Sequence, residues 1–307
     1  MTAPLPRLAK LSSDSERPAA VSVELAGLSV TGPVRQRNED RLGWSVPGDR
    51  VWVPTRQGDE RIAAAELAGP VVVAAVADGL GGHAGGDLAS RFAITTLLDR
   101  ISSPDTLRRL PEALRDAFLE TNGRLLAGDL GSDGAPGGRH LGGQTTLTAL
   151  ALTADTAHVA HVGDCRAYRL RDEALELMTT DHSQAMELLR MRLIRPEQAA
   201  THPGRHLLTR SLGGDVSVRV DVRSGAVREG DAYLLCSDGV WSGVSSGEIL
   251  AALEGDLAVG VQDLVARSLA RGCDDNASVI ALRVLHLAAP LGSDAVRRPL
   301  WRRVLGA

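Results

Sequence analysis

The sequence predicts an α+β fold in which antiparallel β-sheets lie in layers covered by helices. Strand-like runs cluster between Thr145 and Leu177, and the stretches that join them are too short to hold crossover helices. Neighbouring strands must therefore run antiparallel. Segments with helical periodicity come in blocks before and after these strands, which predicts helices packed on the outside of the sheets.

Apolar periodicity places the individual elements along the chain. Val71–Ala77 is apolar throughout, as in a buried strand. The predicted strands, in order, are 24–30, 41–46, 71–77, 145–152, 157–161, 167–171, 218–222, 232–236 and 277–284. The predicted helices are 86–101, 107–126, 183–193, 246–254 and 257–270. Residues 47–70 are expected to be an insertion that contains a short hairpin at 51–53. Residues 128–143 are expected to form a glycine-rich loop.

The composition indicates one globular domain between two irregular ends. Hydrophobic residues make up 44% and charged residues 23% of the 307 residues, and neither a linker nor a solenoid repeat divides them. We expect a disordered lead-in at 1–20, a single domain at 21–287 and an arginine-rich tail at 288–307. Because aromatic residues are only 3% of the chain, Leu, Val, Ala and Ile must fill the core.

Charge and hydropathy exclude several classes of protein. A formal net charge of -4 gives no reason to expect nucleic-acid binding. The longest apolar run, Val71–Ala77, is too short to span a bilayer, and no signal-peptide pattern follows the early basic residues. The three cysteines are widely spaced and fit reduced thiols. We therefore expect a cytoplasmic protein without a transmembrane segment.

Four acidic clusters stand at the ends of apolar strands, where a sheet could gather them at one edge. They are Asn38-Glu39-Asp40, Asp78-Gly79, Asp238-Gly239 and Asp274-Asp275-Asn276. Each alone is typical of a turn. Carboxylates crowded together would repel one another unless a cation neutralised them. Oxygen ligands without a Cys/His cluster point to Mg²⁺ or Mn²⁺ rather than to zinc.

The glycine-rich segment after Asp78 contains one imidazole, that of His83. The segment lacks the Lys-Ser/Thr ending of a Walker A loop, so it does not indicate a nucleotide site. His83 has two interpretations. It is either a surface histidine or, beside a carboxylate metal site, a proton donor near neutral pH.

Eight segments, in this order, resemble the metal-dependent PP2C-like (PPM) protein phosphatase family, particularly its bacterial members. They are TGPVRQRNED (31–40), VADGLGGHAGG (76–86), QTT (144–146), HVGDCRAY (161–168), TDHS (180–183), LLTRSLG (207–213), LCSDG (235–239) and DN (275–276). Together they cover about residues 24–285. The resemblance implies two packed antiparallel sheets with helices on both outer faces, an α-β-β-α sandwich.

The same resemblance implies an enzyme that hydrolyses phosphoserine and phosphothreonine in proteins with water activated by two metal ions, Mn²⁺ or Mg²⁺. Phosphorylated proteins would be its substrates, and an opposing Ser/Thr kinase would be its partner. Asp78 would bridge the two metals, and the Gly79 carbonyl would bind one of them. Asp238 and Asp275 would complete the protein ligands of the other.

The remaining matched positions imply roles around the metals. Glu39 and Asp40 would hold metal-bound waters. Arg35 would clamp the substrate phosphate through its planar guanidinium. His83 would protonate the leaving serine or threonine oxygen. Cys236, inside the strand before Asp238, is expected to be a buried apolar residue without a catalytic role.

The chain departs from the family pattern in two places. Gly142-Gly143 stands where many bacterial relatives carry an aspartate for a third, weaker metal, so we do not expect a third ion of the usual kind. The stretch Ser183–His206 corresponds to a flap that varies within the family and shapes substrate choice.

Two other functions remain open from the sequence. A catalytically silent binding module of the same fold should lose metal carboxylates or the arginine, and this chain retains both. A phosphatase for small-molecule phosphates is also compatible with Arg35 and two metals. An open cleft would favour protein substrates, whereas a closed lid would favour metabolites.

Overall fold

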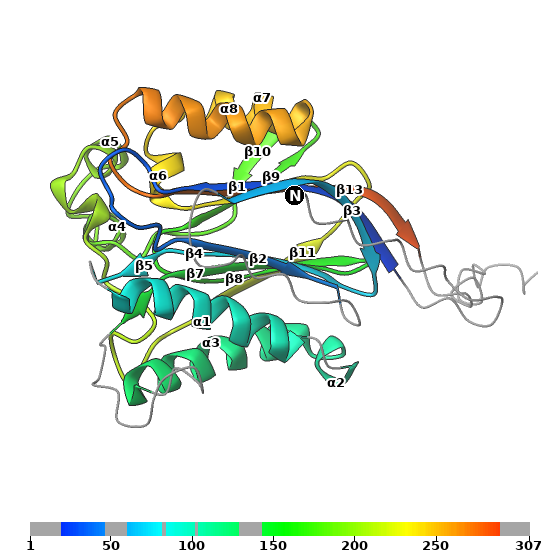
Figure 1. Ribbon diagram of the computed structural model, residues 1–307, viewed down its shortest axis with the longest axis horizontal. Coiled ribbons are helices and arrows are strands. Elements are labelled where there is room, and N and C mark those ends of the chain that lie inside the picture. The colour runs from blue at the N-terminus through cyan, green and yellow to red at the C-terminus, as the bar shows by residue number, and fades with distance from the viewer. Residues whose placement is uncertain (1–19, 47–59, 82–83, 102–103, 129–142, 289–307) are drawn as a thin grey trace, which may run out of the picture.

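Two β-sheets pack face to face in the computed structural model, and helices cover both outer sides (Figure 1). The structure describes residues 20–46, 60–81, 84–101, 104–128 and 143–288. The α-β-β-α sandwich expected from the resemblance is therefore confirmed.

One sheet has six strands, and every adjacent pair of them is antiparallel. Across the sheet the order is β10 (Ala174–Leu177), β9 (Arg166–Arg171), β12 (Ala232–Cys236), β13 (Ala277–Ala288), β1 (Ala20–Val30) and β3 (Glu60–Gly69). The longest pairing joins β1 to β13, from Ala20 opposite Ala288 to Val30 opposite Ala277. Two strands that lie far apart in the sequence are thus neighbours inside this sheet.

The second sheet has five strands, which are also antiparallel. Their order is β11 (Asp221–Ala226), β8 (Thr156–Val162), β7 (Leu147–Leu152), β4 (Val72–Ala77) and β2 (Arg41–Ser45). Along β4, Val72, Ala74 and Val76 point into the core between the sheets. The alternate residues contribute to the core under the helices. Burial on both faces explains why this strand is apolar at every position.

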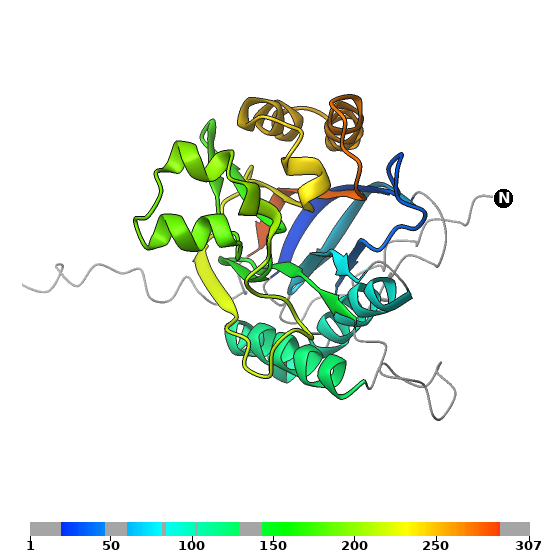
Figure 2. The ribbon, with the colours of Figure 1, turned by 90° about the vertical axis from the view of Figure 1, so that its left-hand side faces the viewer.

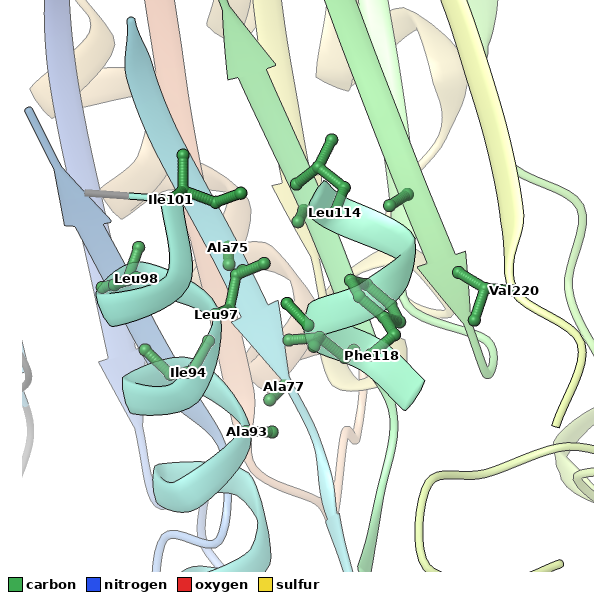
Figure 3. Packing of buried hydrophobic residues seen from close by; sticks show 14 of the residues in the cluster. Ala75, Ala77, Ala93, Ile94, Leu97, Leu98, Ile101, Leu114, Phe118 and Val220 are labelled. Carbon is green, nitrogen blue, oxygen red and sulfur yellow. The ribbon is translucent and has the colours of Figure 1, made fainter. Parts of the chain in front are cut away.

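Helices α1 (Ala84–Ile101) and α3 (Leu110–Ala127), with the short α2 (Pro104–Leu107), cover the five-stranded sheet. Figure 3 shows Leu97 of α1 beside Ala75 of β4, and Phe118 of α3 belongs to the same buried cluster. Small alanines on the strand leave room for these larger side chains. Helices α7 (Ser246–Glu254) and α8 (Leu257–Ala270) cover the six-stranded sheet.

A helical flap lies at one end of the sandwich, and Figure 2 faces that end. It consists of α4 (Gln184–Arg190), α5 (Pro196–Ala200) and the 3₁₀ helix η1 (Pro203–His206). Its two ends are joined by an antiparallel bridge between Ser183 and Leu208. The Thr209 N–H also donates to the His182 carbonyl at 2.8 Å. The two-stranded ribbon of β5 (Gly79–Leu80) and β6 (Gln144–Thr145) lies at the same end.

Most predicted elements are confirmed, but several boundaries were wrong. The predicted strand 145–152 is two strands, because Thr146 leaves the ladder and its N–H donates to the Asp78 carbonyl at 2.8 Å. The strand predicted at 218–222 begins at Asp221, and the helix predicted to reach residue 193 ends at Arg190.

Within the described residues, sequence reasoning missed the strand β3 and several shorter elements, among them the two-residue strand β5. The stretch interpreted as an insertion contains β3, whose alanine and glutamate residues do not show strand periodicity. Strand β10 is mostly exposed and follows a tight turn at Asp172 and Glu173, both with positive φ. The others are α2, α5, η1 and α6 (Asp238–Trp241), each of five residues or fewer. The predicted hairpin at 51–53, most of the glycine-rich loop, the lead-in at 1–19 and the tail from 289 lie outside the described residues.

Among the helices that the structure describes, none combines the length and apolar character needed to cross a bilayer.

Candidate metal centre

The four acidic clusters meet at the flap end of the sandwich. They line one cleft, with a volume of about 1090 Å³. The site residues predicted from the sequence that line it are Arg35, Glu39, Asp78, Gly79, Asp238 and Asp275. The gathering of carboxylates expected from strand ends is therefore observed. His83 lies outside the described residues.

Asp78 and Gly79 follow β4, and the neighbouring chain fixes their backbone. The Asp78 N–H donates to Thr146 Oγ1 at 2.9 Å, and its carbonyl accepts from the Thr146 N–H at 2.8 Å. A Cβ on Gly79 would lie 2.3 Å from the Gly86 carbonyl oxygen and 2.7 Å from that of Glu39. Only glycine allows this close approach of three chain segments.

Asp238 and Asp275 reach the cleft from the six-stranded sheet. Asp238 comes after β12 and opens α6, whereas Asp275 stands just before β13. Arg35 Nη2 donates to Asp275 Oδ2 at 2.7 Å. This contact is the main cause of the raised pKa of Arg35, which keeps the guanidinium charged. Because β12 and β13 are adjacent, the two carboxylates are held on neighbouring strands.

Asn276 joins the loop that carries Arg35 and Glu39 to this pair of strands. Its side-chain oxygen accepts from the Glu39 N–H at 2.8 Å. Its amide nitrogen donates to the carbonyls of Thr31 at 2.7 Å and Arg37 at 3.0 Å. The sequence motif included Asn276, but sequence reasoning gave it no role. The contacts show that it positions the loop.

Asp40 is buried, with 1% of its surface exposed, and accepts a hydrogen bond from Ser237 Oγ at 2.7 Å. Burial raises its pKa to about 7, because an ionised carboxylate is poorly solvated there. Hydrogen bonds from Ser278 and Ser237 oppose this increase, and the negative charge of Asp238 adds to it. A carboxyl that still holds a proton near neutral pH thus lies next to the ligand candidates.

Asp164, in the turn between β8 and β9, is a further carboxylate that sequence reasoning missed. Only 3% of its surface is exposed, and it lines the same cleft. Asp164 follows an apolar strand, which is the signal that identified the other four clusters. The matched segment 161–168 contains Asp164, but no role was predicted for it.

The carboxylates of the cleft destabilise one another in their ionised forms. Burial, followed by the charges of neighbouring aspartates, raises the pKa of Asp78 and of Asp164 well above the ordinary value. Oδ1 of Asp164 and Oδ1 of Asp238 are both buried, with no hydrogen-bond partner in the described part of the chain. Orphaned, mutually repelling oxygens are the arrangement that a divalent cation stabilises. The donor set of carboxylates and a glycine carbonyl fits Mn²⁺ or Mg²⁺.

Cation binding is expected to stabilise the chain more at pH 8 than at pH 5.5. Folding raises the pKa of Asp40, Asp78 and Asp164. The metal-free protein therefore becomes less stable as the pH rises from the ordinary carboxyl pKa through the raised pKa of each group, because the folded state must then hold the ionised form. A cation removes that penalty and competes with fewer protons at pH 8. Free Mn²⁺ at 100 times its Kd adds about 2.7 kcal/mol to the free energy of unfolding. Thermal unfolding with Mn²⁺ or with EDTA at both pH values measures the difference; equal gains would contradict it.

The comparisons with known proteins agree with this geometry. The sequence model of protein phosphatase 2C matches residues 57–258. The serine/threonine protein phosphatase PstP of Mycobacterium tuberculosis is 34% identical over 249 residues, which are 80% of this chain and 45% of the relative. The serine/threonine phosphatase stp of Listeria monocytogenes is 33% identical over 217 residues, or 69% of this chain and 83% of that protein.

A solved structure of the catalytic domain of PstP, in complex with two manganese ions, superposes with a TM-score of 0.63 at 30% identity. The match covers 86% of this chain and 100% of that one. The chain belongs to the protein phosphatase 2C family. It spans less than half the length of the mycobacterial relative, PstP.

Proposed function

We propose that the chain is a metal-dependent phosphatase that hydrolyses phosphoserine and phosphothreonine in proteins. The observation that carries this proposal is the placement of Arg35 beside the crowded carboxylates of Asp78, Asp238 and Asp275 in one cleft. A guanidinium attracts a phosphate dianion, and the carboxylates suit divalent cations. The phosphate-binding group and the candidate metal ligands of a phosphoryl-transfer site thus line the same cleft.

Asp78, Asp238, Asp275 and the Gly79 carbonyl would hold the cations. When bound, divalent cations lower the pKa of water and offset charge on a phosphate. Glu39 lines the cleft, whereas Asp40 lies buried beside Ser237. Both carboxylates would accept hydrogen bonds from water bound to the cations.

Arg35 would orient the substrate. One of its terminal nitrogens donates to Asp275, which fixes the guanidinium at the rim of the cleft. About half of the side chain is exposed, so its other donors remain accessible to a phosphate. We further propose that His83 protonates the leaving oxygen, because an imidazole titrates near neutral pH.

Protein substrates suit this cleft better than small metabolites. Arg35 and Asp275 are 51% and 34% exposed, so the anion-binding end of the site reaches the surface rather than a closed pocket. Relatives named serine/threonine protein phosphatases support the same choice. An opposing Ser/Thr kinase and a cytoplasmic location complete the proposal. The phosphatase domain would occupy 21–287, between a lead-in and an arginine-rich tail.

The test is phosphate release by the purified chain. With Mn²⁺ we expect turnover of p-nitrophenyl phosphate and of a phosphothreonine peptide, and none with EDTA. Asp238→Asn should abolish both activities because it removes a ligand candidate. Turnover of p-nitrophenyl phosphate and sugar phosphates but not of the peptide would favour a small-molecule phosphatase. A folded protein without turnover under Mn²⁺ or Mg²⁺ would identify a silent binding module and refute the proposal.

A further inference from the structure

The five-stranded sheet has an open edge at β11. This strand pairs with β8 alone, from Asp221 opposite His161 to Ala226 opposite Thr156. Elsewhere in the described part of the chain, no backbone hydrogen bond reaches Asp221–Ala226. The Ala226 carbonyl instead accepts from the side chain of Arg171 at 2.6 Å. The outer backbone groups that precede Ala226 can therefore pair with a further strand.

A cavity of about 710 Å³ lies along this edge, and among the described residues it shares none of its lining with the acidic cleft. Val218, Val220 and Val222 line it and pack in or against the core under the helices. Arg219 and Arg223 also line it and alternate with these valines. Because successive side chains of an extended chain point to opposite faces, the cavity borders both faces of the edge. A peptide can add to a sheet as a strand in such a setting.

The two faces of the edge differ in chemistry. On the helical side, Leu119 of α3 lines the same cavity and is 44% exposed, so the surface beside the valines is apolar. Arg115, one helical turn before Leu119, adds a positive charge there. On the opposite side, the side chains of Arg219 and Arg223 are 78% and 53% exposed. An added strand would therefore meet hydrocarbon with every second residue and guanidinium groups with the residues between them.

Positive charge is in excess on the arginine side of the edge. Two carboxylates there each contact two arginines: Asp221 contacts Arg210 and Arg219, and Glu176 of β10 contacts Arg169 and Arg223. Four guanidinium groups thus share two carboxylates. An incoming carboxylate would be attracted to this side, whereas an incoming lysine or arginine would be repelled.

We propose that β11 is a docking edge for an extended segment of a partner protein in which acidic and apolar residues alternate. The backbone of this segment pairs with β11 and supplies affinity. Its apolar side chains lie against Leu119 and Val222, and its carboxylates lie against Arg219 and Arg223. The required alternation follows from the two different faces of the edge.

The charge of the edge argues against two other occupants. A second copy of this chain would bring the arginines of one β11 toward those of the other. The arginine-rich tail at 288–307 has the same sign of charge as the edge. The docking proposal does not rest on the proposed function, because the cavity and the acidic cleft are lined by different described residues.

The test is binding of a fluorescein-labelled peptide of alternating glutamate and valine to the full chain, measured by fluorescence anisotropy. The peptide has about six residues, the usual length of a strand. We expect saturable binding that weakens as salt is added, and no binding of the matched peptide of alternating lysine and valine. The double substitution Arg219→Glu and Arg223→Glu should weaken binding at least about 10-fold. Arg267→Glu is the control, because Arg267 is an exposed, ion-paired arginine on α8, in the other helical layer.

Hydrogen exchange separates strand addition from attraction by charge alone. The glutamate peptide should slow amide exchange in Asp221–Ala226 and leave α8 unchanged. Failure of this peptide to bind, equal binding of the lysine peptide, or binding without slower exchange in β11 would overturn the proposal. Dimerisation of the free chain through β11, seen by sedimentation, would also overturn it, because a second copy would then occupy the edge.

The docking proposal and the proposed function fail separately. Release of phosphate from p-nitrophenyl phosphate should be the same in the Arg219→Glu and Arg223→Glu variant as in the wild type, because neither arginine lines the acidic cleft. Peptide binding by a chain without phosphate release would retain the docking edge and refute the phosphatase. Phosphate release by a chain that does not bind the peptide would do the reverse.

Discussion

Asp78→Asn is expected to lower Mn²⁺-dependent phosphate release by at least about 10³-fold, equal to about 4 kcal/mol of transition-state stabilisation. Asp78 directly follows β4 and lines the acidic cleft, and the charges of Asp40, Asp238, Asp164 and Asp275 all act on it. An amide keeps the shape of the side chain but loses the charge that attracts a cation. Steady-state kinetics on p-nitrophenyl phosphate measures the loss.

The same substitution is expected to raise the melting temperature of the metal-free protein. Removing one of several crowded carboxylates relieves repulsion that the folded state otherwise carries. A variant that is inactive but more stable in EDTA distinguishes a functional role from simple misfolding. Asp116→Asn, on the exposed side of α3, is the control and should change neither quantity. Full activity in Asp78→Asn would refute the assigned ligand set.

Phe118→Ala is expected to lower the free energy of unfolding by about 3–5 kcal/mol. Phe118 is fully buried on α3, between α1 and the five-stranded sheet (Figure 3). Few aromatic side chains are present to fill this layer, and many strand residues of its cluster are alanines, which are too small to expand into a cavity. Since domains are stable by only about 5–15 kcal/mol, the loss is a large fraction. Urea unfolding followed by circular dichroism measures it.

Leu119→Ala provides the matched control for the core substitution. Leu119 is the next residue of α3, but 44% of it is exposed. We expect a change within about 0.5 kcal/mol. If both variants lost equal stability, the burial of Phe118 in the core would not be the cause of its loss.

The layered fold could be predicted because its main elements show strong periodicity. Val72–Ala77 is buried on both faces and α8 on one face, so the pattern of apolar residues in each predicts its environment. Elements with little buried surface show no such pattern. Strand β3 is defined by its backbone pairing with β1 at the sheet edge, and β10 by a turn that places two non-glycine residues at positive φ. Their residues alone do not reveal these partners.

The site was predictable in part for a similar reason. Asp78, Asp238 and Asp275 each stand beside an apolar strand, so their convergence follows from the sheets. Nδ1 of His206 lies 3.2 Å from Asp238 Oδ2, but His206 stands in a short 3₁₀ helix, so this contact depends on how the flap folds back over Trp241. No local pattern encodes that distance. The proton retained by Asp40 likewise arises from burial that only the assembled cleft creates.

The pairing of β1 with β13 has a consequence for synthesis of the chain. The two strands are separated by more than 200 residues and yet are neighbours at the centre of one sheet. During translation, β1 has no central partner until residue 288 has emerged from the ribosome. Because a loop this long must close first, we expect β1 and β13 to pair late and slowly during folding. Asp275 and Asn276 directly precede β13, so the cleft of a nascent chain stays incomplete until β13 docks.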